Sequence, residues 1–506
     1  MPPSVDDIWT MAAIENIDLD ADEAEPLRDG VAAIVEAAAR AEQLEKFVLP
    51  VKYPARDAGR RPNVGEDEYN AVITFCHVTG SHEGPLSGKS IGCKDNISVA
   101  GVPTTDGSKL QSYVPVCDAT VVERLLDAGG VITAKLNMDD MAGGATGETS
   151  AYGPARNPAN PAHSAGGSSG GSGAAVRAGI VDIALGVDQG GSGRIPAAFC
   201  GVVCMKATHG LVPSFGVTHI DHTIDFVTPM ARSVHDVAVT LEAIGGEDWR
   251  DPQWVRGAIG SAHYAGARTQ GIRGLRVGLI RESVEAVDCA PAVCKGLDAA
   301  RSALQDAGAS VEVMSIPMWA HGFTIFQPYV AHLVANMIRS EGEGYGHLGY
   351  IDADRMHAFA ARRRAESFNM NPVVKCWIIA DRWLHERFLN QSYGNLHNLR
   401  LLLRRRVTSA LEAFDLLLTP TVPMTAPLLA EGELTCGQLL ERTPATVAAN
   451  TCQLNLTGHP ALSLPSGSSP HPEQLPVAVQ LIGRHFDETT VFRAAFAVEE
   501  RLGPRT

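Results

Sequence analysis

The pattern of apolar and polar positions changes along the chain. In most of the chain, short apolar runs alternate with segments whose apolar residues recur every three or four positions. From about residue 72, short apolar runs such as 90–97 and 131–137 predict strands. Between them lie segments such as 118–130, which have apolar residues three or four positions apart and end in glycine, as helices do. The alternation continues beyond residue 170. It predicts an α/β fold, with a layered mixed β-sheet core covered by helices.

Two parts of the chain depart from this alternation. Residues 1–71 are expected to be an alanine-rich helical extension that closes with a polar, glycine- and proline-containing linker at 54–67. Residues 317–410 contain aromatic- and arginine-bearing helical patterns with no strand pattern between them. The core is therefore expected in two pieces, 72–316 and 411–506. The insertion between them is expected to be a small helical domain that covers a pocket.

Composition and charge narrow the function. The formal net charge is −15, which argues against nucleic acid as a partner because phosphate binding needs a basic surface. No apolar run reaches about 18 residues, and the acidic N-terminus lacks a signal-peptide profile. We therefore expect a soluble, cytoplasmic protein that does not enter membranes. The ten cysteines form no C-x-x-C pair, which favours reduced thiols over disulfides or a metal site.

Three residues offer the chemistry of acyl transfer. Ser168 lies in the glycine-serine block 166–173, and Ser192 lies 24 residues later in the segment 188–194. Consecutive glycines before Ser192 allow a tight turn and expose N–H groups at a helix N-terminus, where an oxyanion is stabilised. Lys94 follows a strand pattern and would serve as a base if burial keeps its amine neutral. Taken singly, these residues also fit a helix cap, a flexible linker and a structural ion pair.

Together with their flanks, these segments resemble the amidase signature family. The resemblance is carried by GPLSGKSIGCKDNISVAGVPTTDGS at 84–108, by the glycine-serine block, and by GVDQGGSGRIPAAFCG at 186–201. It implies the amidase signature fold. It also implies that Ser192 is the nucleophile, Ser168 a relay serine and Lys94 the base.

The resemblance further implies how the site is built. It implies a cis peptide bond between Gly167 and Ser168. Backbone N–H groups for an oxyanion hole would come from a run of four residues, Gln189, Gly190, Gly191 and Ser192. The substrate would contact Gln189 and a second run, Gly143, Gly144, Ala145 and Thr146. Neither a metal nor a cofactor is expected to take part.

Within the family, the motifs are most similar to bacterial amidases associated with nitrile degradation. DQGGS at 188–192, THGLVP at 208–213 and the N-terminal extension carry this similarity. It implies a homodimer built partly by the N-terminal helices, and a Gln189 side chain that hydrogen-bonds the scissile amide. Three segments differ from the usual family pattern. Gly193 replaces an isoleucine, residues 143–146 stand where the family often has a Met-Gly-Ser-Ser type segment, and residues 204–208 replace Gly-x-Lys-Pro-Thr.

The expected function is metal-independent hydrolysis of a small-molecule carboxylic amide, or of a related aryl amide, carbamate or urea. Aromatic residues of the insertion could form an aryl-accepting pocket or could simply pack its helices together. These residues are Trp319, Phe323, Phe326, Trp377 and Trp383.

Three other functions stay open. A metal-dependent amidohydrolase would use the two histidines and the aspartate at 218–222. The amidase subunit of a tRNA-dependent amidotransferase shares the same triad, although the N-terminal extension and DQGGS fit it poorly. A non-catalytic, amidase-like binding domain would be expected to lack a triad residue, whereas Lys94, Ser168 and Ser192 are all present.

Overall fold

The chain divides into two separate units, residues 1–50 and residues 51–506. The computed structural model describes residues 3–110, 112–251, 253, 262–345, 348–442 and 446–503.

The N-terminal unit contains two helices in its described residues. Helix α1 (Val5–Glu15) begins after Ser4, whose side chain forms a capping box with Asp7. Helix α2 (Ala24–Ala41) carries the alanine-rich stretch and begins before Gly30, so this glycine lies inside the helix. The unit leaves several large apolar side chains exposed, among them Ile14 and Ile34.

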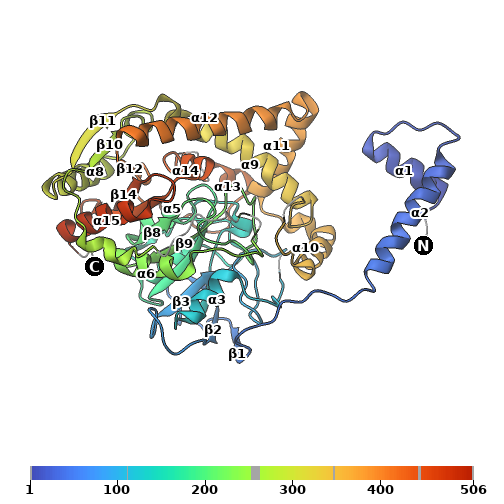
Figure 1. Ribbon diagram of the computed structural model, residues 1–506, viewed down its shortest axis with the longest axis horizontal. Coiled ribbons are helices and arrows are strands. Elements are labelled where there is room, and N and C mark those ends of the chain that lie inside the picture. The colour runs from blue at the N-terminus through green and yellow to red at the C-terminus, as the bar shows by residue number, and fades with distance from the viewer. Residues whose placement is uncertain are drawn as a thin grey trace. The chain divides into compact units, whose positions relative to one another are not determined.

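The larger unit is organised around a mixed β-sheet, which confirms the predicted α/β class (Figure 1). Its described residues form twelve strands in one sheet. In sheet order these are β1 (Arg56–Arg60), β2 (Val72–Val78), β4 (Val131–Leu136), β3 (Ser90–Lys94), β7 (Ile183–Asp188), β9 (Phe226–Ala231), β8 (Val203–Lys206), β13 (Ala461–Ser468), β14 (Pro476–Ile482), β12 (Leu416–Pro420), β10 (Arg276–Ile280) and β11 (Ser310–Met314). A separate hairpin pairs β5 (Arg156–Asn157) with β6 (Asn160–Ser164).

Helices pack on the sheet through apolar faces that recur every three or four residues. In α3 (Thr120–Asp127), for example, Val121 and Leu125 are fully buried on one such face. One core cluster joins the strands to α3, α6 (Val234–Ile244), α8 (Pro291–Asp306) and α15 (Glu488–Leu502). A second cluster contains residues of α4 (Gly170–Arg177) and α5 (Arg194–Cys200). Shorter helical segments are α7 (Glu282–Glu285), α13 (Cys436–Glu441), α14 (Cys452–Thr457), η1 (Asp140–Ala142), η2 (Ala265–Thr269), η3 (Pro317–His321) and η4 (Ser367–Asn369).

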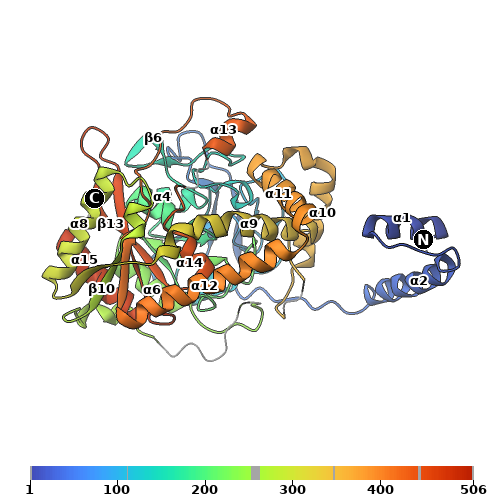
Figure 2. The ribbon, with the colours of Figure 1, turned by 90° about the horizontal axis from the view of Figure 1, so that it is seen from above.

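The inserted segment is mostly helical in its described residues and contains no strand among them, as its sequence pattern predicted. It contains α9 (Gly322–Arg339), α10 (Ala353–Glu366), α11 (Pro372–Phe388) and α12 (Gln391–Ala413). Helix α9 packs against both α11 and α12, and the three lie side by side in two perpendicular views (Figures 1 and 2). A third apolar cluster joins these helices to the ends of β10, β12 and β14.

The order of the strands brings three loops to one edge of the sheet. Strand β3 pairs in parallel with both β4 and β7. Because parallel strands point the same way, their carboxyl ends meet at one edge. Lys94, Asn137 and Gln189 stand at or just beyond those ends, although they lie far apart in the sequence.

The segment 54–67 is not a linker, which corrects the sequence-based expectation. Residues Arg56–Arg60 form strand β1, which pairs with β2 in antiparallel orientation at the edge of the sheet. The strand is short and mostly polar, which suits an edge position, and it contains no apolar run that would mark it in the sequence.

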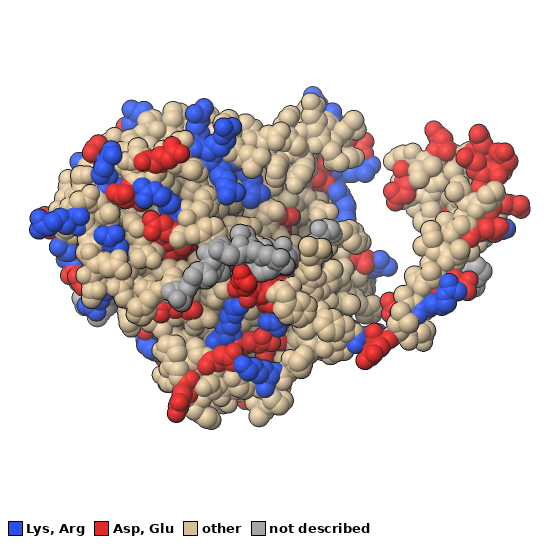
Figure 3. Space-filling view, in the orientation of Figure 1, with Lys and Arg blue, Asp and Glu red and all other residues tan. Residues whose placement is uncertain are grey.

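The surface of the larger unit mixes charges of both signs. On the face drawn in Figure 3, lysine and arginine side chains are interspersed with aspartate and glutamate. Among the described residues, no helix is long and apolar enough to cross a membrane.

A prediction concerns the glycine block at the start of α4. A Cβ at position 171 would overlap the backbone of Ala71 and of Asn137. We expect Gly171→Ala to lower the free energy of unfolding by about 1–3 kcal/mol, the usual effect of overpacking. Gly437 has open space around its Cα, so Gly437→Ala is the matched control and should change stability by less than about 0.5 kcal/mol. Urea unfolding of both variants tests this, and equal stabilities would contradict it.

Candidate active site

Lys94 is fully buried at the end of β3 and is held by two acceptors. Its Nζ lies 2.7 Å from Ser168 Oγ and 3.2 Å from the carbonyl oxygen of Val187 in β7. Burial lowers the pKa of Lys94 to about 7, against the opposing attraction of Asp139 and other buried carboxylates. A large fraction of the amine is therefore neutral near pH 7, which is the state that a base requires.

Ser168 lies directly before α4 and is also fully buried. The peptide bond between Gly167 and Ser168 is cis, as the family resemblance implied. The Ser168 carbonyl accepts a hydrogen bond from the Asp139 N–H at 3.1 Å. A Cβ at position 167 would overlap the Asp139 carboxylate, so glycine is the residue that fits there.

Ser192 lies in the turn between β7 and α5, and 8% of its surface is exposed. Its carbonyl accepts a hydrogen bond from the Ser169 N–H at 3.1 Å, which joins the relay segment to the nucleophile turn. The Gly191 N–H donates to Asp188 Oδ1 at 2.8 Å and is engaged within the turn. The N–H groups of Gly190 and Ser192 have no acceptor within the described part of the chain.

The neighbouring side chain of Thr228 explains why position 193 is a glycine in this chain. A Cβ at position 193 would overlap the side chain of Thr228 in β9. The isoleucine usual in the family at this position would therefore need a different neighbour, and glycine accommodates the threonine.

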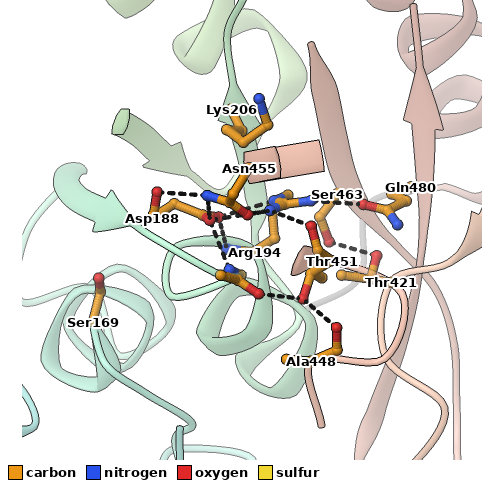
Figure 4. A network of polar contacts seen from close by, with 12 residues as sticks. Ser169, Asp188, Arg194, Lys206, Thr421, Ala448, Thr451, Asn455, Ser463 and Gln480 are labelled. Atoms are coloured by element: carbon orange, nitrogen blue, oxygen red, sulfur yellow. Dashed lines mark hydrogen bonds and ion pairs between the residues drawn. The ribbon is translucent and has the colours of Figure 1, made fainter. Parts of the chain in front are cut away.

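A buried ion pair holds the nucleophile turn at both ends. Asp188 precedes the turn and Arg194 follows it, and neither has any side-chain exposure. Arg194 Nε donates to Asp188 Oδ2 at 2.9 Å, and Nη2 donates to Oδ1 at 3.0 Å (Figure 4). This bidentate geometry fixes orientation as well as distance.

Further hydrogen bonds of this pair involve the C-terminal part of the chain. Arg194 donates to Asn455 Oδ1 at 2.8 Å and to Gln480 Oε1 at 3.1 Å, and Asn455 Nδ2 donates to Asp188 Oδ1 at 2.9 Å. The Thr451 hydroxyl donates to the Gly190 carbonyl at 2.7 Å. Burial alone would raise the pKa of Asp188, but Arg194 and these hydrogen bonds hold it at about 2.

Sequence reasoning assigned no role to Thr451, Asn455 or Gln480. The one signal for Gln480 was a polar residue inside the otherwise apolar strand β14. A fully buried amide must be hydrogen-bonded, so such a residue indicates a specific partner. The identity of that partner, Arg194, comes from the tertiary structure.

A cavity of about 850 Å³ opens beside Ser192 and is largely walled by the inserted helices. Of the aromatic residues singled out from the sequence, four line it: Phe323, Phe326, Trp377 and Trp383. Trp319 does not; it is buried and donates from Nε1 to Asn450 at 3.1 Å, so it packs the helical domain. The Phe326 ring lies against Gly190, where a Cβ would overlap it.

The residues expected to contact the substrate are only partly at the cavity wall. Gly144, Ala145 and Gln189 line the cavity, whereas Gly143 and Thr146 are outside its described lining. The Gly143 carbonyl accepts from Asn371 Nδ2 at 2.8 Å, and the Thr146 carbonyl accepts from Ser164 Oγ at 2.6 Å. The carbonyls of these two residues are therefore engaged by neighbouring side chains, and their contact with the substrate stays a prediction. The Gln189 side-chain amide is buried, and neither its nitrogen nor its oxygen has a partner among the described residues.

The histidine cluster at 218–222 is a set of polar contacts beside the insertion. His222 Nε2 lies 3.3 Å from Glu343, and His219 Nδ1 lies 3.5 Å from Asp225. Within the described residues, no group of three histidine, cysteine or acidic side chains is placed to hold a metal ion.

A prediction follows from the Asp188–Arg194 pair. The folded-state pKa of about 2 lies below the ordinary value near 3.8, which corresponds to about 2 kcal/mol of stability above pH 4. That stability is lost as the pH falls toward 2. We expect Asp188→Asn to cost about 3–5 kcal/mol at pH 7, because it leaves Arg194 buried and unpaired.

Urea unfolding at pH 7 and at pH 3 measures both effects. The difference in free energy of unfolding between wild type and Asp188→Asn should be smaller at pH 3 than at pH 7. Asp298→Asn, on an exposed position of α8, is the control. It should leave the free energy of unfolding unchanged at both pH values. A variant as stable as wild type at pH 7 would contradict the assignment.

Comparisons with known proteins identify the family of the chain. The family model described as "Amidase" matches residues 73–492. A glutamyl-tRNA(Gln) amidotransferase subunit from Natronomonas pharaonis is 39% identical over 437 residues, which cover 85% of this chain and 99% of the relative. These matches do not single out the nitrile-degradation branch that the motifs suggested.

Solved structures show the same fold. The corresponding glutamyl-tRNA(Gln) amidotransferase subunit from Thermotoga maritima matches with a TM-score of 0.68 and 30% identity, covering 85% of this chain and 87% of that chain. A 6-aminohexanoate cyclic dimer hydrolase, solved with its substrate, matches with a TM-score of 0.71 and 26% identity over 83% of this chain and 86% of that chain. The chain belongs to the amidase signature family and is an enzyme that hydrolyses amide C–N bonds.

Proposed function

We propose that this protein hydrolyses a neutral, largely apolar carboxylic amide without a metal, through an acyl-enzyme on Ser192. The observation that carries the proposal is the buried contact between Lys94 and Ser168, taken together with the apolar cavity that Ser192 lines. In this arrangement neutral Lys94 takes the proton of Ser168, and Ser168 takes the proton of Ser192. Ser192 Oγ then attacks the amide carbonyl carbon.

The tetrahedral intermediate carries its negative charge on the former carbonyl oxygen. The N–H groups of Gly190 and Ser192 are available to bind it, and Gln189 precedes them in the same turn. The proton returns through Ser168 to the leaving nitrogen, the C–N bond breaks, and an ester remains on Ser192. Water activated by the same relay then cleaves this ester and restores the enzyme.

The cavity supports the choice of a neutral, apolar substrate. Its lining is aromatic and aliphatic, and Lys375 is the one charged residue among the described lining residues. An α-ammonium group would find no carboxylate there to pair with. The unpartnered amide of Gln189 supplies one donor and one acceptor, which match the carbonyl and the N–H of a substrate amide.

A second candidate is the glutaminase subunit of a tRNA-dependent amidotransferase. It is supported by the identity of 39% to such a subunit over most of both chains. That function requires glutamine as the amide donor and further protein subunits as partners. The two candidate functions therefore differ in their substrate and in whether activity depends on partner subunits.

The N-terminal unit supports a further part of the proposal, association into a homodimer. Its two described helices leave Ile14 and Ile34 largely exposed. A unit of 50 residues has little core of its own, so covering this apolar surface would stabilise it.

The pH dependence of catalysis tests the base. Because Lys94 must be neutral and its pKa is about 7, kcat/KM should rise with pH, with a midpoint near 7, and level off above it. Lys94→Arg should abolish this rise along with activity, since arginine stays protonated. Lys375→Arg, at the cavity wall, is the control and should keep the midpoint of the pH profile.

Ser192→Ala tests the nucleophile. It should lower kcat for amide hydrolysis by at least about 10⁴-fold, and amide hydrolysis that survives it would refute the mechanism.

A substrate comparison tests the amide class. We expect an aryl amide to be hydrolysed by the purified chain with higher kcat/KM than glutamine, because of the apolar lining. Phe326→Ala should lower kcat/KM for the aryl amide by about 10- to 200-fold. Phe368→Ala, an exposed phenylalanine of the inserted domain outside the described cavity lining, should leave it unchanged. If glutamine is the preferred substrate, alone or with amidotransferase partner subunits, the second candidate is correct instead.

A further inference from the structure

A second serine in the inserted domain is hydrogen-bonded to a histidine–aspartate pair. His332 lies on α9, Asp381 on α11 and Ser392 on α12. His332 Nδ1 is 2.6 Å from Asp381 Oδ1, and His332 Nε2 is 3.0 Å from Ser392 Oγ. None of the three lines the cavity beside Ser192. The arrangement is therefore separate from the site described above.

The contacts hold the histidine ring between the carboxylate and the hydroxyl. One ring nitrogen faces a carboxylate and the other a hydroxyl, so the neutral ring donates from Nδ1 and accepts at Nε2. His332 and Asp381 are both buried, whereas Ser392 is partly exposed. Arg339 Nη1 lies 2.5 Å from the second oxygen of Asp381 and forms an ion pair with it. The Tyr393 ring packs edge-on against the imidazole at 5.9 Å.

The start of α12 supplies hydrogen-bond donors next to the serine. Ser392 is the second residue of this 23-residue helix, and Asn390 at the cap makes no side-chain hydrogen bond to it. The first N–H that bonds within the turn is that of Gly394, which donates to the Asn390 carbonyl at 3.2 Å. The N–H groups before it have no intrahelical acceptor, and they carry the positive end of the helix dipole. An oxyanion formed at Ser392 would lie within their reach.

We propose that Ser392 is a second nucleophilic serine, activated by His332 and oriented by Asp381, that reacts with small acyl esters independently of Ser192. Ser392 Oγ attacks the ester carbonyl while its proton passes to His332 Nε2. The C–O bond to the leaving group breaks, and His332 returns the proton to the leaving oxygen. Water then hydrolyses the Ser392 ester by the same exchange. The acyl group has to be small, because Ser392 is only partly exposed.

The experiment uses the full chain with Ser192→Ala, so that the first nucleophile is silent. The protein is treated with a small fluorophosphonate, and labelled peptides are identified by mass spectrometry. We expect covalent label on Ser392, and release of p-nitrophenol from p-nitrophenyl acetate above the background of Ser192→Ala/Ser392→Ala. Ser367, an exposed serine of the same domain, should carry no label.

The histidine is tested by His332→Asn in the Ser192→Ala background. Label on Ser392 should then form at least tenfold more slowly, and Asp381→Asn should slow it as well. His332→Asn in the otherwise wild-type chain must still label at Ser192, which shows that the variant is folded. Absence of label on Ser392, or an unchanged rate after His332→Asn, would overturn the proposal and leave the three residues as a structural link between helices.

Discussion

The buried ion pair between Asp188 and Arg194 is the constraint on which the catalytic region depends. The ion pair joins the two ends of the turn that contains Ser192. Arg194 also donates hydrogen bonds to Asn455 and Gln480 in the C-terminal part of the chain. Two buried charges are tolerated only when each is paired and fully hydrogen-bonded. The nucleophile turn, helix α5 and strand β14 therefore have to assemble together. The geometry at Ser192 is set in part by Gln480, which lies 286 positions beyond Arg194 in the sequence.

A second constraint acts on Lys94. A lysine in water is protonated at neutral pH, whereas burial lowers the pKa of Lys94 to about 7, the condition that the proposed role as a base requires. Full burial of an amine needs cover from every side. Strand β7 supplies part of that cover, since the Val187 carbonyl accepts from Lys94, and Ser168 Oγ is the second acceptor. The position of β3 between β4 and β7 thus both places Lys94 and buries its amine.

The catalytic turn and the cavity determine different properties of the enzyme. The turn carries the three residues proposed to break the bond or lies against them, and under that proposal it specifies the kind of bond that is broken. The cavity is walled largely by α9 and α11 of the insertion, with Phe326 against Gly190 and with the Gln189 amide, which has no partner among the described residues, in its lining. Relatives that share the turn can differ in these helices, which is why an overall identity of 39% does not decide the substrate.

The sequence by itself determined the fold class, the helical nature of the insertion and the identity of Lys94, Ser168 and Ser192 as candidates, because these are written in local periodicity and in short motifs. It misread 54–67, since an edge strand made mostly of polar residues has no apolar run to mark it. It could not separate Trp319, which packs the core, from Phe326, which lines the cavity, because both lie in one helical pattern. Only the tertiary structure decided that Gly191 is engaged by Asp188, that the Gly143 carbonyl is engaged by Asn371, and that His332, Asp381 and Ser392 meet. Most of these contacts join residues that are distant in the chain, and the local sequence pattern does not predict such contacts.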